Sequence, residues 1–192
     1  MNTKERIIDT AANMLSNNGF NAFSFHDIAK DIGIKTSSIH YYFPTKPDLI
    51  VEIIRYSQST QTALFESISK NLPIEKLSIL IDFYIDLANK GKMCPIVSIS
   101  SDMNDIDHNV KVEVRKFYDF LSAWLASVLE EGMKENQFLS EQNPKNKSIE
   151  ILNILAMMPI LSRLGKGPES FERIKQSIIE NLLNKGYDTK DK

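Results

Sequence analysis

The chain has 192 residues with 42% hydrophobic and 25% charged side chains, a composition typical of globular rather than disordered proteins. The formal net charge is −2, and residues 1–56 hold six basic and six acidic side chains, so bulk charge gives no sign of nucleic-acid binding. No apolar run approaches the ~20 residues that span a bilayer. The N-terminus lacks the apolar core of a signal peptide, and the single cysteine excludes an internal disulfide. We therefore expect a soluble, cytoplasmic protein that does not interact with membranes.

Helical spacing of apolar residues dominates the first part of the chain, and residues that favour caps, turns or helix ends divide it into segments. We expect three short helices followed by a longer one, because the residue before a proline leaves helical geometry and a proline in the first turn costs little. The expected helices run from Thr3 as cap to the Asn17–Gly19 turn, from Ser24 to Gly33, from near Thr36 to just before Pro44, and from Thr45 as cap to Ile68.

The rest of the chain has the same helical periodicity in longer stretches. The expected segments are a helix over 77–88 that stops at Gly91, a less regular stretch over 92–109, a long helix from Val110 that closes near Gly132, a polar loop over 140–147, and two final helices over 149–163 and 168–184. The predicted fold class is all-α. We predict an N-terminal three-helix domain over residues 1–46 and a C-terminal helical bundle over residues 47–192.

The second and third expected helices have the features of a helix-turn-helix. Gly33 provides the tight turn, and the small side chain of Ala29 lets the two helices approach closely. No acidic residue occurs from Ile32 to Pro47. The outer face of the later helix therefore presents hydroxyl, imidazole, phenol and ammonium groups, which can donate to phosphates or base edges without repelling them.

The segment from Phe25 to Leu49, FHDIAKDIGIKTSSIHYYFPTKPDL, closely resembles the DNA-binding signature of the TetR family of bacterial repressors. The matching features are the paired Ile-Ala and Ile-Gly, the small residues that begin the recognition helix, and the aromatic-Phe-Pro-x-Lys exit. The preceding helix also matches, with its Arg6-Ile7-Ile8 start and Asn18-Gly19-Phe20 end. The motif covers about the first quarter of the chain, and the length and helical plan of the remainder fit the family.

The resemblance implies that the start of the recognition helix reads bases, whereas its end and the start of the next helix contact phosphates. His40 stands where the family commonly has tyrosine, and His26 is either a backbone contact or a solvent-exposed side chain. Lys46 adds a cation to the free N–H groups of a helix start, a combination suited to one phosphate. The predicted DNA-binding residues are His26, Lys35, Thr36, Ser37, Ser38, His40, Tyr41, Tyr42 and Lys46.

The two final helices are apolar enough to be buried on more than one face. The resemblance implies that they form a four-helix interface in a homodimer. Dimerisation also has a physical reason, since two recognition helices must lie about one DNA turn apart, roughly 34–36 Å, to read a palindrome. The alternative is a monomeric bundle in which these apolar stripes form the core.

No catalytic constellation accompanies the amphipathic helices of the C-terminal region, which suggests a binding domain. A small-molecule inducer would lower DNA affinity to the extent that it prefers the conformation that binds DNA poorly. The candidate pocket residues between the long connecting helix and the helices over 77–129 are Phe65, Tyr84, Met93, Cys94, Met103, Phe117, Phe120 and Trp124.

The stretch around Cys94 has two interpretations. Lys90 and Lys92 are nearby cations that favour the reactive thiolate. The Gly-x-x-Cys-Pro pattern with the acidic run that follows also resembles the subgroup of N-ethylmaleimide-responsive repressors, which implies a thiol-based sensor of electrophiles or redox state. The alternative is that Cys94 is a small buried hydrophobic residue.

Enzyme and metal motifs are missing from the sequence. There is no GxSxG, HExxH, P-loop or Rossmann fingerprint. The carboxylates over 102–113 fail as a calcium loop, because Ile106 and Asp107 occupy positions that need an oxygen ligand and a glycine. We therefore expect no enzyme, no metal and no cofactor. The leading hypothesis is a homodimeric repressor that binds a palindromic DNA operator and is released by a small molecule; the alternative class is a helical adaptor for protein partners.

Overall fold

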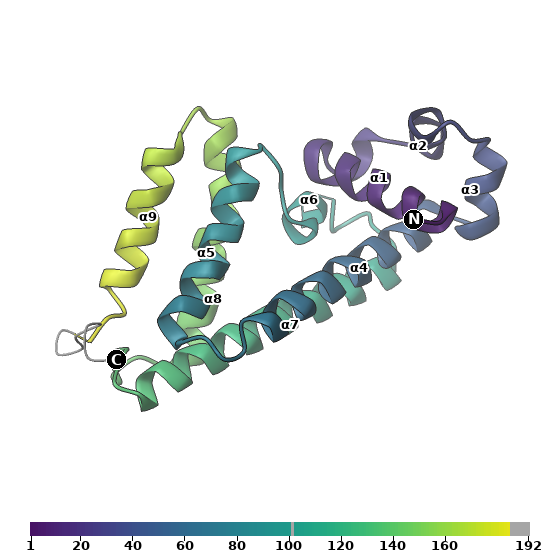
Figure 1. Cartoon of the computed structure of the whole chain (residues 1–192). Coiled ribbons are helices and arrows are strands. Elements are labelled where there is room, and N and C mark those ends of the chain that lie inside the picture. The colour runs from purple at the N-terminus through teal and green to yellow at the C-terminus, as the bar shows by residue number, and fades with distance from the viewer. Residues whose placement is uncertain (101, 185–192) are drawn as a thin grey trace. The chain divides into compact units, whose positions relative to one another are not determined.

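The computed structural model describes residues 1–100 and 102–184, and in these ranges the ordered elements are helices (Figure 1). An antiparallel bridge pairs Phe138 with Leu183. The prediction of an all-α fold is confirmed. The helices are α1 (Thr3–Asn18), the 3₁₀ turn η1 (Phe20–Ala22), α2 (Phe25–Ile32), α3 (Thr36–Tyr42), α4 (Lys46–Ser67), α5 (Pro73–Asn89), α6 (Pro95–Ser100), α7 (His108–Lys134), α8 (Pro144–Arg163) and α9 (Pro168–Glu180).

The chain divides into two compact units. The first unit comprises Met1–Ala63 and Lys92–Tyr118, and the second comprises Leu64–Gly91 and Asp119–Lys192. The long helices α4 and α7 each contribute residues to both units. The predicted division into domains at residues 46 and 47 stays a prediction, since the compact units group the chain by packing and not by function.

Local capping signals explain the short helices of the first unit. The side chain of Asn2 accepts a hydrogen bond from the backbone N–H of Glu5, and the Glu5 carboxylate accepts one from the Asn2 N–H. The prediction of Thr3 as the cap is therefore wrong by one residue. Ser24 caps α2 through the same kind of reciprocal bond with Asp27, as its position predicts.

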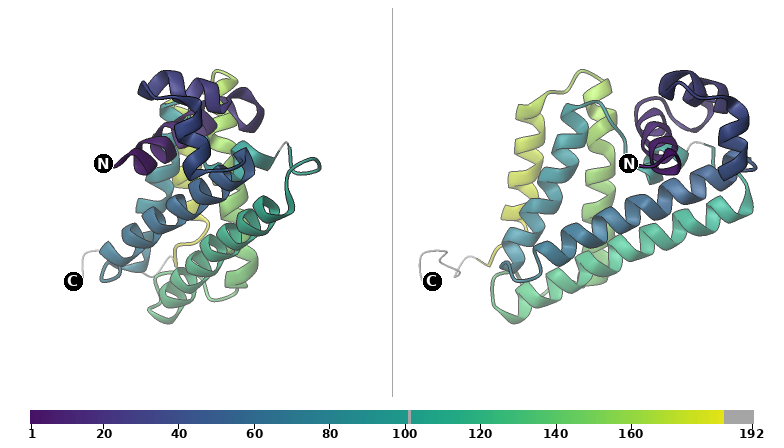
Figure 2. Two further views of the ribbon diagram at one scale, coloured as in Figure 1. Left: turned by 90° about the vertical axis from the view of Figure 1, so that its right-hand side faces the viewer. Right: turned by 45° about the vertical axis from the view of Figure 1, so that its right-hand side comes forward.

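The apolar positions of α1 to α4 form the core of the first unit. Figure 2 shows α1, α2 and α3, coloured purple to blue, packed close together. Two polar contacts brace this core. The Arg6 guanidinium donates to the carbonyl of Ile32 at 2.8 Å, and the Lys4 ammonium lies 2.8 Å from the Glu52 carboxylate. The fully or nearly fully buried side chains include Ile7, Ala11, Leu15, Ile28, Ile39, Phe43, Leu49 and Ile53.

In the second unit α5 packs against α8 and α9 (Figure 1). The long helix ends close to the predicted position near Gly132: α7 continues two residues further to Lys134, and the chain turns at Asn136, which has a φ of 58°. Gly132 serves a different purpose. A Cβ placed on it would lie 2.1 Å from the ring of Phe138, so only glycine leaves room for that buried ring.

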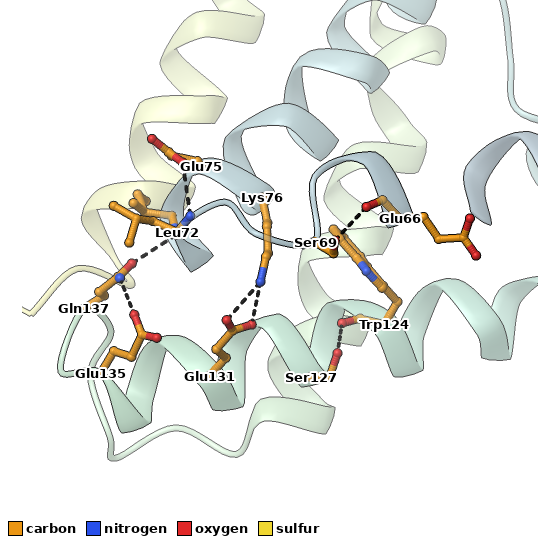
Figure 3. Close-up of polar contacts among 11 residues, drawn as sticks. Glu66, Ser69, Leu72, Glu75, Lys76, Trp124, Ser127, Glu131, Glu135 and Gln137 are labelled. Atoms are coloured by element: carbon orange, nitrogen blue, oxygen red, sulfur yellow. Dashed lines mark hydrogen bonds and ion pairs between the residues drawn. The ribbon is translucent and has the colours of Figure 1, made fainter. Parts of the chain in front are cut away.

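A polar network around the buried Lys76 and Gln137 side chains ties α5 to α7 and to the loop after α7 (Figure 3). The Lys76 ammonium, whose side chain is 7% exposed, donates to both carboxylate oxygens of Glu131 at 2.8 and 2.9 Å. The buried Gln137 side chain accepts from the N–H of Ile74 in the first turn of α5 and donates to Glu135. These bonds compensate for the burial of polar groups that would otherwise cost free energy.

Helix α8 begins inside the predicted polar loop over 140–147. The Asn143 side chain accepts from the N–H groups of Lys145 and Asn146, and Pro144 occupies the first turn, where no donor is needed. Among the residues that the structure describes, no helix is both long and apolar enough to cross a membrane.

Candidate nucleic-acid interface

The α2–turn–α3 segment has helix-turn-helix geometry. Gly33 adopts the left-handed conformation with a φ of 71°, and the N–H of Ile34 donates to the carbonyl of Ala29 at 3.0 Å. Ile28 and Ala29 on α2 and Ile39 on α3 are buried together in the core of the first unit. The opposite face of α3 is left exposed, as required of a helix that enters a DNA groove.

Most of the residues predicted to contact DNA lie on α3 or in the turn before it. Tyr41 is 82% exposed, Tyr42 is 38% exposed, and their rings meet edge to face with centroids 5.1 Å apart. His26, Lys35, Ser37 and His40 are also exposed, whereas Thr36, Ser38 and Lys46 are partly buried. Eight of the nine predicted residues therefore lie on α2, on α3 or in the turn between these helices. The ninth, Lys46, is the first residue of α4.

A shallow groove lies beside the exposed face of α3. Its lining residues are Thr3, Ile34, Ser37, Ser38, Tyr41 and Tyr42. Thr3 belongs to the first turn of α1, so it joins the surface of the recognition helix without being near it in the sequence. Thr3 is not among the residues predicted for the interface, because in the sequence it indicates only a helix start and gives no sign of DNA contact.

His40 occupies the last turn of α3. Its Nδ1 lies 3.3 Å from the carbonyl oxygen of Pro44, and its ring contacts the Phe25 ring edge on with centroids 4.9 Å apart. Pro44 holds Phe43 in extended geometry and thereby ends the helix. The imidazole thus contacts two neighbours while His40 as a residue stays exposed.

The Lys46 ammonium points into the first unit. It donates to the carbonyl oxygens of Phe20 and Phe23 at 2.5 and 2.6 Å, and it lies 4.7 and 4.3 Å from the centroids of the two rings. Burial lowers the pKa of the Lys46 ammonium below its ordinary value, and the charges of Asp102 and Asp27 oppose that shift. Lys46 thereby holds η1 against the start of α4. Its phosphate contact stays a prediction.

Helix α1 is hydrogen-bonded to the segment that leads into α6. The N–H of Met93 donates to the carbonyl of Ser16 at 2.9 Å, and the Ser16 hydroxyl donates back to the carbonyl of Met93 at 2.7 Å. The Lys92 ammonium donates to Asn13 at 2.9 Å. These contacts join residues 77 and 79 positions apart, so the sequence pattern held no signal for them.

An ion-pair cluster connects α4 with α7 inside the first unit. The Glu113 carboxylate lies 2.9 Å from the Lys116 ammonium and 3.3 Å from the Arg55 guanidinium. The hydrogen bond from Lys116, together with the charge and hydrogen bond of Arg55, holds the pKa of the Glu113 carboxyl below its usual value. Because the Glu113 side chain is largely buried, the two cations compensate for removing its charge from water.

The structure brings together three of the eight predicted pocket residues. In the second unit the Phe65 ring stacks on Trp124 with centroids 3.6 Å apart and on Phe120 with centroids 5.7 Å apart. Tyr84 belongs to the same unit and contacts Phe83. The four residues that fall in the first unit are Met93, Cys94, Met103 and Phe117.

Cys94 is 8% exposed, and its carbonyl accepts hydrogen bonds from the N–H and the hydroxyl of Ser98 in α6. This placement matches the interpretation of a small buried residue. Thiol sensing stays a prediction, as does the inducer pocket.

Comparison with known proteins identifies the class of this fold. Residues 7–53 match the family model described as bacterial regulatory proteins of the tetR family. A TetR transcriptional regulator from Legionella pneumophila is 30% identical, with 95% of this chain and 98% of that chain covered and a TM-score of 0.86. The chain belongs to the TetR family of transcriptional regulators. It is therefore a helix-turn-helix transcription regulator and not an enzyme, and the family predicted from the sequence is confirmed.

Two further relatives place this TetR-family chain in context. The biofilm operon icaADBC negative transcriptional regulator IcaR of Staphylococcus aureus (strain Newman) is 25% identical over 129 residues, which are 60% of this chain and 69% of IcaR. The reduced form of Escherichia coli NemR matches with a TM-score of 0.84 over 97% of this chain and 100% of that chain, at 14% identity. That likeness shows the fold alone, so membership of the N-ethylmaleimide-responsive subgroup stays a prediction.

Proposed function

We propose that the protein is a homodimeric repressor that binds a palindromic operator through α3 and is released by a small molecule. The observation that carries the proposal is the exposed face of α3, which lies in helix-turn-helix geometry and belongs to a stretch without acidic side chains from Ile32 to Pro47. The negative regulator IcaR supports repression rather than activation. Binding to chromosomal DNA implies action in the cytoplasm.

The proposed DNA contacts change along α3, from base edges at its start to phosphates at its end. Lys35, Thr36 and Ser37 begin the helix and enter the major groove, where N-terminal residues of a recognition helix reach base edges. Ser38, His40, Tyr41 and Tyr42 follow and contact phosphates with their donors, as does His26 from the first turn of α2. This arrangement separates sequence readout from backbone positioning.

Dimerisation through α8 and α9 is supported by an exposed apolar stripe. Ile149 and Met157 on α8 are 42% and 45% exposed, and Leu164 directly after α8 is 70% exposed. Separations of eight and seven residues place them on one face of a helix. A groove between α8 and α9 lined in part by Leu161 and Ile174 adds apolar surface. Contact between two such faces would remove this surface from water.

The proposed inducer site lies at the three predicted pocket residues that the second unit brings together, Phe65, Phe120 and Trp124. The stack of Phe65, Phe120 and Trp124 supports an apolar, flat ligand, because offset aromatic rings pack well against planar groups. A ligand that binds the conformation of low DNA affinity more tightly than the other would release the operator. The loss of DNA affinity is set by the ratio of the ligand's affinities for the two conformations.

The test is a fluorescence anisotropy titration in a series of salt concentrations, with DNA from upstream of the gene and a scrambled fragment. We expect tight, steeply salt-dependent binding of two chains to the upstream DNA. Ser37→Glu, which places a carboxylate on the face of α3, should abolish binding, whereas Ser140→Glu on an exposed loop of the second unit should bind normally. Failure of the wild-type protein to bind either DNA at low salt would refute DNA binding and favour the adaptor.

The dimer has its own test by analytical ultracentrifugation. We expect Met157→Glu to sediment as a monomer and to lose the cooperative two-chain complex with DNA. A monomeric wild-type protein at micromolar concentration would contradict the dimer and support the alternative of a monomeric bundle.

A further inference from the structure

The hydrogen bond between His40 and Pro44 decides which ring nitrogen carries the proton. The Pro44 carbonyl oxygen can only accept, so the Nδ1 atom that lies 3.3 Å from it must donate. A neutral imidazole carries one N–H. Its Nε2 atom then holds a lone pair and accepts hydrogen bonds instead of donating them.

The place of His40 on the recognition helix decides what it faces on DNA. His40 lies in the last turn of α3, beyond the N-terminal residues that reach base edges. The end of such a helix runs along the sugar-phosphate backbone. A phosphate oxygen is an acceptor, so the neutral ring would meet it with the wrong atom, whereas an imidazolium would donate from Nε2 and add a positive charge.

Donation to the phosphate falls to the His40 ring, because neighbouring charged groups are engaged in hydrogen bonds within the protein. The carboxylates of Asp27 and Asp48 are engaged in helix caps: Asp27 accepts from Ser24, and Asp48 accepts from Thr45. The Lys46 ammonium donates to η1. The titratable groups on the elements around His40 are His26, Asp27, Lys30 and Asp31 on α2, Lys35 at the turn, Tyr41 and Tyr42 on α3, and Lys46 and Asp48 at the start of α4.

We propose that His40 couples operator binding to the uptake of a proton, so that the DNA affinity of this regulator rises as the pH falls from 8 to 6. This inference rests on the proposed DNA binding and adds a pH response to it. On binding, a proton from solvent adds to Nε2, and the new N–H donates to a phosphate oxygen while Nδ1–H keeps its bond to Pro44.

The experiment measures operator affinity by anisotropy at pH 6, 7 and 8 and constant ionic strength. Linkage limits the change to about tenfold per pH unit for each proton taken up. For the wild-type protein we expect at least about fivefold tighter binding at pH 6 than at pH 8. His40→Gln keeps an N–H donor that does not titrate, so its affinity should change by less than about twofold. His108→Gln, on α7, is the matched control and should respond to pH like the wild type.

Proton uptake is measured independently by isothermal titration calorimetry of the wild-type protein in two buffers with different ionisation enthalpies. We expect net uptake at pH 7 that His40→Gln lacks and that His26→Gln keeps in large part. An equal pH response in the wild-type protein and His40→Gln would overturn the inference while leaving DNA binding intact. Binding that weakens as the pH falls would overturn it as well, because neutral Nε2 would then be accepting from a base. Absence of salt-dependent binding at every pH would instead refute the proposed function.

Discussion

The internal position of Lys46 makes a prediction about stability that differs from a phosphate contact. We expect Lys46→Ala to destabilise the protein, because the carbonyl oxygens of Phe20 and Phe23 each lose a charged donor. A hydrogen bond to a charged group contributes about 1.5–3 kcal/mol when well buried. Because the Lys46 side chain is only partly buried, we take the two bonds together at about 2 kcal/mol.

The assay combines thermal unfolding with a salt series of DNA affinity. For a chain of this size 1 kcal/mol corresponds to about 2–4 °C, so Lys46→Ala should unfold roughly 4–8 °C below the wild type. Lys35→Ala is the matched control: this exposed lysine should leave the midpoint within about 2 °C and reduce the slope of log affinity against log salt by about 0.9 for each chain that contacts DNA.

An unchanged unfolding midpoint for Lys46→Ala would refute the reasoning from its two carbonyl partners. A lower midpoint with an unchanged salt slope would assign Lys46 to the packing of η1 alone. A lower midpoint with a shallower slope would add the phosphate contact predicted from the sequence.

Two further substitutions test the packing of each unit. Gly132→Ala should lower the free energy of unfolding by about 1 kcal/mol, because overlap with the Phe138 ring costs more than the roughly 1 kcal/mol that alanine gains in a helix; a higher midpoint in calorimetry would contradict this. Glu113→Gln should destabilise at pH 7. The pKa of the Glu113 carboxyl is lower in the folded than in the unfolded protein, so its ionised form stabilises the fold at pH values above the ordinary pKa. This stabilisation is lost as the pH falls through the pKa of the folded state. The difference in unfolding free energy between wild type and variant should therefore close in melts at acid pH. A gap independent of pH would contradict this.

The helix-turn-helix was predictable because its signals are local. Ser24 caps α2 in the sequence position that a cap requires, Gly33 turns the chain with a positive φ, and Pro44 ends α3. Each of these effects acts over a few residues, so a single sequence contains the information. The fold class and the exposed face of α3 follow from the same local rules together with helical periodicity.

Long-range packing accounts for what the sequence did not reveal. Glycine near the end of a helical pattern ordinarily signals a stop, yet Gly132 lies inside α7 because the Phe138 ring needs the space. A lysine at a helix start ordinarily points to solvent, yet Lys46 turns toward the carbonyls of Phe20 and Phe23 at the two ends of η1. In both cases the decisive partner is set by tertiary structure, which overrides the local preference.

The bonds between α1 and the segment before α6 can form only late in the synthesis of this protein. Ser16 leaves the ribosome 77 residues before Met93, and Asn13 leaves it 79 residues before Lys92. At a synthesis rate of about 5–20 residues per second, the N-terminal helices wait roughly 4–16 s for their partners. A nascent chain that has emerged only as far as α5 thus carries a helix-turn-helix whose α1 still lacks its bonds to Lys92 and Met93, and α1 reaches its full set of contacts only after α6 emerges.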